Sequence, residues 1–154
     1  MNKKFNIMWL TGQPGAGKTT LSNEIVRIIK SQKQFNDIEI IQIDGDDLRD
    51  ITENKDYSKK GRINNIKLSQ NLALFCQNKG FLVVVSLVSP YLELRENFKS
   101  RTDVNEFYIF TNEARGKEHY FSKDYVKPEK DFISIDTTEK TINESAKEIL
   151  SFYW

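Results

Sequence analysis

Apolar, β-rich runs alternate along this chain with stretches whose apolar residues recur at helical spacing. The runs predict strands at 5–11, 38–43, 81–87, 105–110 and 132–135, and the helical spacing predicts helices at about 18–31, 62–79, 90–99 and 138–151. This alternation favours an α/β fold, with a mainly parallel sheet of about five strands and helices on both faces. Ligands of such folds bind beyond the carboxyl ends of the strands, so the residues that follow each strand are the first candidates for a site.

Two helix ends are marked by local signals. Gly80 stands where a glycine would end the second long helix, directly before the most apolar strand. Thr137, Thr138 and Glu139 form a plausible start for the last helix.

Length and composition bound the kind of protein. The 154 residues predict a single domain, 1–154, that is large enough to bury a core. Lys and Arg total 23 against 22 acidic residues, so we expect no nucleic-acid partner. The longest apolar run, Phe81 to Val85, is too short to span a membrane. The single cysteine, Cys76, fits a packed thiol in a reducing compartment, and we expect a cytoplasmic enzyme.

A phosphate-binding loop lies between the first strand and the first helix. Its residues match the pattern G-x-x-x-x-G-K-[ST] at every fixed position: Gly12, Gln13, Pro14, Gly15, Ala16, Gly17, Lys18 and Thr19. Such a loop curls its N–H groups and the start of the next helix, here including Thr20, toward phosphate oxygens. Lys18 can reach the β- and γ-phosphates, and the Thr19 hydroxyl can complete the shell of Mg²⁺. We therefore expect ATP and Mg²⁺ as cofactors and a P-loop NTPase fold, a three-layer α/β/α sandwich. The alternative is a glycine-rich turn that matches by chance, against which the position between a predicted strand and a predicted helix argues.

A cluster of carboxylates follows the second strand. Asp44, Asp46 and Asp47 would repel one another unless a cation or a hydroxyl donor shared their charge. Beside a bound triphosphate, Asp46 is predicted to orient and deprotonate the attacking hydroxyl of an acceptor, and Asp44 to help hold Mg²⁺ through water or to fix the loop. The alternative is an acidic turn that caps the next helix.

With these blocks the chain resembles the adenylyl sulfate kinases, which transfer the γ-phosphoryl group of ATP to the 3′-hydroxyl of adenosine 5′-phosphosulfate. The resemblance covers about residues 5–95 and rests on four blocks in the family's order. They are Ile7 to Gly12 running into the phosphate loop, Asp44-Gly45-Asp46 with Arg49, Tyr57-Ser58 followed by Arg62 and Asn65-Ile66, and Ser86-Leu87-Val88-Ser89-Pro90-Tyr91.

The resemblance implies roles for the residues of these blocks in binding the acceptor. Arg49 and Arg62 would face the phosphosulfate, since a guanidinium can hold such a group through two parallel hydrogen bonds; the alternative for each is a solvated surface charge. The other implied contacts are a base stacked between Tyr57 and Phe121, a hydrogen bond from Asn65, and contacts from Val88 and Ser89. The resemblance also implies a homodimer.

The chain departs from the family pattern in the segment between the fourth and fifth strands. Family members usually carry a longer basic lid there, whereas this chain has a short one at about 112–127 without the family's lid motif. Its cations could neutralise phosphates from above or belong to an ordinary polar loop: Arg115, Lys117, Lys123 and Lys127. His119, the only histidine, is expected to face solvent.

Other departures leave the acceptor open. Gly61 stands where relatives commonly have Asp, Asp47 replaces the usual Asn, and Lys67-Leu68 replaces a common Arg pair. The acceptor could thus be another nucleotide adduct, such as a cytidine diphosphate that carries a phosphoramidate group. A nucleoside, gluconate or shikimate kinase is a further alternative, against which the Ser89-Pro90-Tyr91 block argues. A non-catalytic nucleotide switch is another, against which the retained Lys18, Thr19 and Asp46 and the lack of an Asn-Lys-x-Asp motif argue.

Overall fold

Five parallel strands form a single sheet in the computed structural model, which describes residues 4–154. The strand order is β2-β3-β1-β4-β5, and every neighbouring pair is parallel. The strands are β1 (Ile7–Thr11), β2 (Ile40–Asp44), β3 (Leu82–Ser86), β4 (Val104–Phe110) and β5 (Phe132–Asp136). Residues 1–3 of the predicted domain lie outside the described residues.

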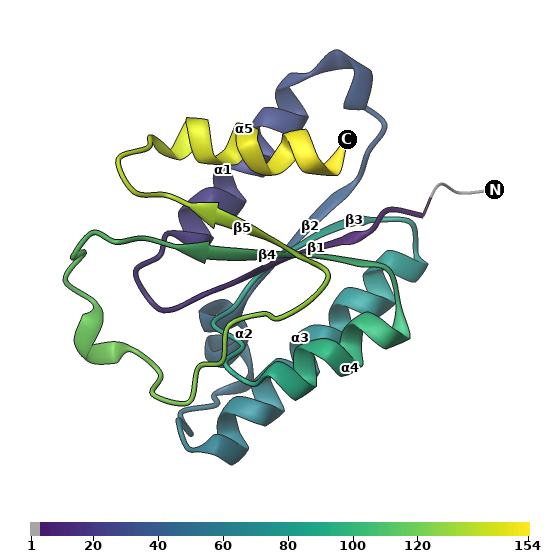
Figure 1. Ribbon diagram of the computed structural model, residues 1–154. Coiled ribbons are helices and arrows are strands. Elements are labelled where there is room, and N and C mark those ends of the chain that lie inside the picture. Colours follow the sequence, from purple (N-terminus) through teal and green to yellow (C-terminus); the bar gives the residue numbers. More distant parts are fainter. Residues whose placement is uncertain (1–3) are drawn as a thin grey trace.

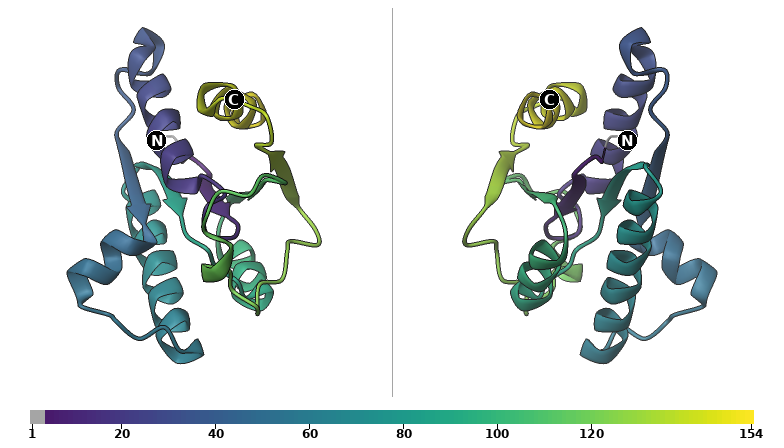
Figure 2. Two further views of the ribbon diagram at one scale, coloured as in Figure 1. Left: turned by 90° about the vertical axis from the view of Figure 1, so that its left-hand side faces the viewer. Right: turned by 90° about the vertical axis from the view of Figure 1, so that its right-hand side faces the viewer.

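Helices cover both faces of the sheet (Figures 1 and 2). One face carries α1 (Lys18–Ser31) and α5 (Ile142–Tyr153), and the other carries α2 (Gly45–Thr52), α3 (Lys59–Asn78) and α4 (Leu92–Arg101). Two short 3₁₀ turns, η1 (Lys33–Phe35) and η2 (Glu118–Tyr120), lie in the connections. The predicted three-layer α/β/α P-loop fold is confirmed.

The sequence of the central strand β1 is apolar from Ile7 to Leu10, without the alternation of apolar and polar residues that a half-exposed strand shows. All five of its residues are buried, because neighbouring strands flank it and helices cover both of its faces. Successive side chains point to opposite faces, so Met8 and Leu10 join the core beneath α1 and α5, while Ile7 and Trp9 join the core beneath α3 and α4.

The last helix starts later than predicted. Glu139 has a φ of 55°, a left-handed conformation that no α-helical residue adopts. The helix instead begins after Thr141, whose hydroxyl accepts from the Glu144 N–H at 3.1 Å while the Glu144 carboxylate accepts from the Thr141 N–H at 2.8 Å. This reciprocal capping box, four residues downstream of Thr137, is the true start signal.

Two helix starts in the site region also differ from the prediction. The pattern did not predict α2, an eight-residue helix that Asp44 caps directly after β2. Helix α3 begins at Lys59 rather than at 62, because the Ser58 hydroxyl caps it by accepting from the Gly61 N–H at 3.4 Å. The predicted C-terminal glycine, Gly80, follows α3 with a φ of 96°.

The carboxyl ends of the strands, the phosphate loop and the segment 111–131 between β4 and β5 gather at one end of the sheet (Figure 1). Across residues 4–154, none of the helices has both the length and the apolarity that a membrane crossing requires. Cys76 is half-buried against the apolar cluster beneath α3, and burial raises the pKa of its thiol.

Candidate active site

The phosphate loop follows β1, and its glycines permit close approaches that other residues would prevent. A Cβ on Gly12 would stand 2.2 Å from the backbone oxygen of Ile109, and a Cβ on Gly15 would stand 2.9 Å from the Cβ of Lys117. Gly15 has a φ of 83°, in the left-handed region that favours glycine. The loop therefore curls tightly against β4 on one side and against the segment 111–131 on the other.

Lys18, the first residue of α1, lies over this loop. Its side chain is buried, and its Nζ donates to the backbone oxygen of Gln13 at 2.9 Å. Burial lowers the pKa of Lys18 to about 8, although the negative charges of Asp44 and Asp46 oppose the shift. A buried ammonium beside a glycine-rich loop at the start of a helix is a site for an anion such as a polyphosphate.

Asp44 joins the phosphate loop to α2. Its Oδ2 accepts from the Thr19 hydroxyl at 2.7 Å and from the Ser86 hydroxyl at 3.0 Å, while its Oδ1 accepts from the Asp46 N–H at 2.9 Å. The sequence offered two interpretations of Asp44, a residue of the nucleotide site or the cap of the next helix. Its carboxylate makes contacts of both kinds, since it caps α2 and also accepts from Thr19 of the phosphate loop.

The Thr19–Asp44 pair fits Mg²⁺ bound together with a triphosphate. Mg²⁺ prefers oxygen ligands and usually keeps several waters, so it needs one or two protein groups plus phosphate oxygens. Within residues 4–154 no group of three or more His, Cys, Asp or Glu side chains could hold a metal without such help. Thr19 would bind the ion through its hydroxyl, and Asp44 would orient a bound water.

A cavity of about 890 Å³ brings the phosphate loop and the predicted acceptor residues to one place. The predicted residues that line it are Pro14, Gly15, Gly17, Lys18, Thr19, Thr20, Asp44, Asp46, Arg49, Tyr57, Arg62, Asn65, Val88, Ser89 and Phe121. Gly12, Gln13 and Ala16 of the predicted set are not among its lining residues.

Arg49 is held in place rather than left as a solvated charge. Its Nη1 donates to the backbone oxygens of Asn54 and Asp56, each at 3.0 Å. Its guanidinium lies 4.1 Å from the centroid of the Tyr57 ring. Because Tyr57 is 63% exposed and Phe121 is 44% exposed, both rings at the cavity offer apolar surface to a ligand.

Asn65 presents an unused acceptor. The residue is 3% exposed, and its Nδ2 donates to the Gly45 backbone oxygen at 3.2 Å, which fixes the orientation of the amide. Its Oδ1 is buried and has no hydrogen-bond partner among the residues that the structure describes. A buried acceptor without a partner is costly, so a ligand that donates a hydrogen bond there would be stabilised.

Ser122 ties the lid to the two sides of the cavity, a role that the sequence does not predict. The Gln13 side chain accepts from the Ser122 N–H at 2.9 Å and donates to the Ser122 oxygen at 3.0 Å. Arg62 of α3 donates to the Ser122 hydroxyl at 3.1 Å. No local motif marks Ser122, because its partners lie 60 and 109 residues away in the chain.

The basic residues of the lid divide into two groups. Arg115 and Lys117 line the cavity, and Arg115 donates to the backbone oxygens of Ala16 at 3.3 Å and Thr137 at 3.2 Å. Lys123 and Lys127 are exposed and are not among the lining residues. His119 is exposed, as predicted.

A phosphate loop that faces an acidic helix start across one cavity of a parallel α/β sheet defines a P-loop kinase. The model of the adenylylsulphate kinase family matches residues 4–119, and the chain belongs to that family, whose members are phosphotransferases with an alcohol group as acceptor.

Curated relatives agree with this assignment. The chain is 33% identical to the adenylyl-sulfate kinase of Burkholderia ambifaria over 64% of this chain and 53% of that protein, so the match spans about half of that relative's length. It is 28% identical to the adenylyl-sulfate kinase of Staphylococcus epidermidis over 97% of this chain and 84% of that protein. It is also 33% identical to the cytidine diphosphoramidate kinase of Campylobacter jejuni over 67% of this chain and 59% of that protein.

Solved structures share the fold. The APS kinase of Mycobacterium tuberculosis, solved in complex with AMPPNP and APS, superposes with a TM-score of 0.80 at 21% identity and covers 96% of both chains. A gluconokinase from Sinorhizobium meliloti reaches a TM-score of 0.64 at 14% identity, over 97% of this chain and 91% of that one.

Proposed function

We propose that this protein is an ATP-dependent kinase that transfers the γ-phosphoryl group to the 3′-hydroxyl of a nucleotide adduct, with adenosine 5′-phosphosulfate as the first candidate. The observation that carries this proposal is a shared cavity of about 890 Å³, which the phosphate loop lines on one side and Asp46, Arg49, Arg62 and Asn65 line on the other. A triphosphate on the loop and a nucleotide against those side chains would meet within it.

The donor half of the site would bind and polarise the triphosphate. Backbone amides of the loop and the Lys18 ammonium would hold the β- and γ-phosphates, and Thr19 with Asp44 would hold Mg²⁺, which supplies positive charge to the phosphate oxygens when bound. Phosphoryl transfer asks little covalent help from the protein, so alignment and charge neutralisation account for most of its rate.

Asp46 would act on the acceptor. It is an exposed carboxylate in the first turn of α2, it lines the cavity, and its backbone is fixed by Asp44. From there it would accept the hydrogen bond of an acceptor hydroxyl and take up its proton as the phosphoryl group arrives.

The remaining acceptor contacts follow from the chemistry of the lining. Arg49 and Arg62 would pair with the acidic adduct, and Tyr57 and Phe121 would pack against the base. The unpartnered Oδ1 of Asn65 would accept a hydrogen bond from a hydroxyl or amino group of the acceptor.

A cytidine diphosphate adduct is the second candidate acceptor. The relative from Campylobacter jejuni is named for cytidine diphosphoramidate, and its identity of 33% equals that of the Burkholderia ambifaria adenylyl-sulfate kinase.

A coupled ADP-release assay with the two acceptors side by side tests the proposal. We expect release that depends on one adduct, with kcat/KM for that adduct at least about tenfold above the other, since the base and the adduct contact different lining residues. ADP release that neither adduct stimulates would contradict the proposed function.

A further inference from the structure

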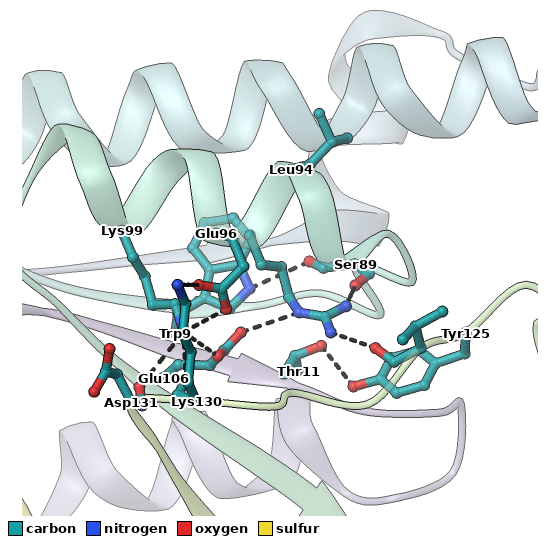
Figure 3. A network of polar contacts seen from close by, with 12 residues as sticks. Trp9, Thr11, Ser89, Leu94, Glu96, Lys99, Glu106, Tyr125, Lys130 and Asp131 are labelled. Carbon is teal, nitrogen blue, oxygen red and sulfur yellow. Dashed lines mark hydrogen bonds and ion pairs between the residues drawn. The ribbon is translucent and has the colours of Figure 1, made fainter.

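A buried guanidinium on α4 lies behind the acceptor side of the cavity. Arg95 and Glu106 are each about 2% exposed, and the Arg95 Nε donates to the Glu106 Oε2 at 3.0 Å. Lys99 donates to the other Glu106 oxygen at 2.9 Å (Figure 3). Burying these charges costs solvation free energy, and their mutual attraction offsets that cost only when the geometry is good. Stabilisation of the fold therefore does not by itself account for this buried cluster.

Arg95 holds the backbone of the loop after β3. Its Nη1 donates to the Ser89 backbone oxygen. Ser89 has a φ of 46°, a left-handed conformation that is unfavourable for a residue other than glycine and persists only where its surroundings hold it. The Trp9 indole supports it as well, by donating to the Ser89 hydroxyl at 3.2 Å (Figure 3). Ser89 lines the cavity on the acceptor side.

The same guanidinium holds the carboxyl end of the lid. Its Nη2 donates to the Val126 backbone oxygen, and its carbon lies 5.3 Å from the centroid of the Tyr125 ring. The Val126 N–H donates to the Pro90 oxygen at 3.0 Å, which joins the lid end to the β3 loop.

A second link joins the lid end to β1. The Tyr125 hydroxyl lies 2.9 Å from the Thr11 hydroxyl (Figure 3). The Thr11 hydroxyl itself donates to the Val88 backbone oxygen at 2.8 Å. Because Thr11 uses its proton on Val88, Tyr125 is the donor of the pair. Burial raises the pKa of Tyr125 to about 12, so the phenol keeps that proton at neutral pH.

We propose that Arg95 is a positioning residue that holds the acceptor loop 88–90 and the carboxyl end of the lid in one arrangement. This role rests on the proposed function of the cavity, because the loop matters only if an acceptor binds against it. A planar guanidinium can donate to Glu106, Ser89 and Val126 in three directions at once, whereas a lysine ammonium in its place is a compact charge on a flexible stem.

The first test compares Arg95→Lys with Arg101→Lys, a matched change on the exposed side of the same helix. For Arg95→Lys we expect the KM for the acceptor to rise by about tenfold or more while the KM for ATP stays within about twofold, because a misplaced loop costs alignment at one substrate only. Arg101→Lys should change neither constant. An unchanged acceptor KM in Arg95→Lys, or an equal rise of both constants, would overturn the assignment.

Limited trypsin digestion provides a readout that does not depend on turnover. Lys123 is exposed in the lid, three residues before Val126, whose backbone oxygen Arg95 holds, whereas Pro128 prevents trypsin from cutting after Lys127. We expect cleavage after Lys123 to be faster in Arg95→Lys than in Arg101→Lys, and equal rates would contradict the anchoring role. If the wild-type enzyme used neither adduct, the proposed function would fail, while the digestion would still decide whether Arg95 anchors the lid.

If Arg95→Lys does not fold, Tyr125→Phe provides a second test of whether the anchors of the lid affect acceptor binding. It removes only the hydroxyl that reaches Thr11. We expect the acceptor KM to rise roughly threefold, the effect of one ordinary hydrogen bond, with the ATP KM unchanged. No change in the acceptor KM would count against a role of this network in acceptor binding.

Discussion

At the scale of single residues, Asp44 and Asp46 show how two neighbouring carboxylates take different positions. The Asp44 carboxylate accepts hydrogen bonds from Thr19, Ser86 and the first turn of α2, so it caps that helix and links it to the phosphate loop. Asp46 is exposed to the cavity from the first turn of the helix that Asp44 caps. The sequence suggested different roles for Asp44 and Asp46. The fold adds that helix α2 separates them, because Asp44 caps this helix and Asp46 lies in its first turn.

Asp46→Asn tests the division. We expect kcat to fall by roughly 100-fold to 10,000-fold, because the amide cannot take up the proton of the acceptor hydroxyl, while the affinity for ATP stays near that of the wild type. Asp47→Asn is the matched control, since Asp47 is an exposed neighbour that is not among the lining residues. Equal losses in kcat and in ATP affinity would reassign Asp46 to the metal.

Gly61 illustrates a departure from the family pattern that has a local cause. A Cβ at this position would stand 2.0 Å from the Asp56 backbone oxygen, so no side chain fits in this turn. Asp56 accepts from the Ser58 N–H at 2.9 Å and so supports the turn before α3. The sequence could report the substitution but not this reason.

At the scale of elements, helix α3 contacts the lid through Arg62. Its Nη1 donates to the Ser122 hydroxyl at 3.1 Å, and the residue also lines the cavity. If an acceptor binds in the cavity as proposed, a guanidinium at this place would lie beside its acidic adduct.

Arg62→Ala should raise the KM for the acceptor by about tenfold and leave the KM for ATP unchanged, because a charge-assisted contact to the adduct is lost on one side of the cavity. Steady-state kinetics with each substrate varied in turn measures this split. Lys67→Ala, at an exposed position of the same helix, controls for the loss of positive charge. An acceptor KM equal to that of the wild type would return Arg62 to a purely structural contact.

Helices α1 and α5 are linked by a carboxylate whose titration should be visible. Glu24 accepts from Arg27 at 2.7 Å and from Asn143 of α5 at 2.8 Å, and chiefly the hydrogen bond from Arg27 lowers the pKa of Glu24 from 4.5 to about 2. The folded state thus binds this proton less readily than the unfolded state, so the contribution of Glu24 is present above pH 4.5 and is lost as the pH falls toward 2.

Glu24→Gln should therefore lower the melting temperature at pH 7, and the difference from the wild type should shrink as the pH falls from 4.5 toward 2. Melting curves over this pH range provide the measurement, with Glu93→Gln as a control at an exposed position of α4. If the difference in melting temperature between wild type and Glu24→Gln stayed constant over this pH range, the ionised form of Glu24 would not be stabilised by its hydrogen bonds in the folded state.

At the scale of the whole molecule, the sequence predicted what local patterns determine. Buried parallel strands read as continuous apolar runs, and the phosphate loop carries its own spacing, so the sheet, most helices and the donor side could be predicted. The anchors of the lid could not, because Ser122, Arg95 and Tyr125 meet partners far away in the chain. Helix α2 was missed because its eight residues include only two large apolar side chains, Leu48 and Ile51, which are too few to define a helical period. The roles of the site residues and the homodimer stay predictions.

The proposed function requires a phosphoryl group to cross this cavity from the loop to a sugar hydroxyl. A single-turnover reaction with γ-labelled ATP, Mg²⁺ and each adduct tests it most directly, with Lys18→Met as the variant and Lys30→Met, at an exposed position of the same helix, as its control. We predict that the label moves to the 3′-hydroxyl of one adduct in the wild type and in Lys30→Met, and that transfer falls at least about 100-fold in Lys18→Met. Label released only as inorganic phosphate, or transfer that survives in Lys18→Met, would rule out the proposed phosphoryl transfer.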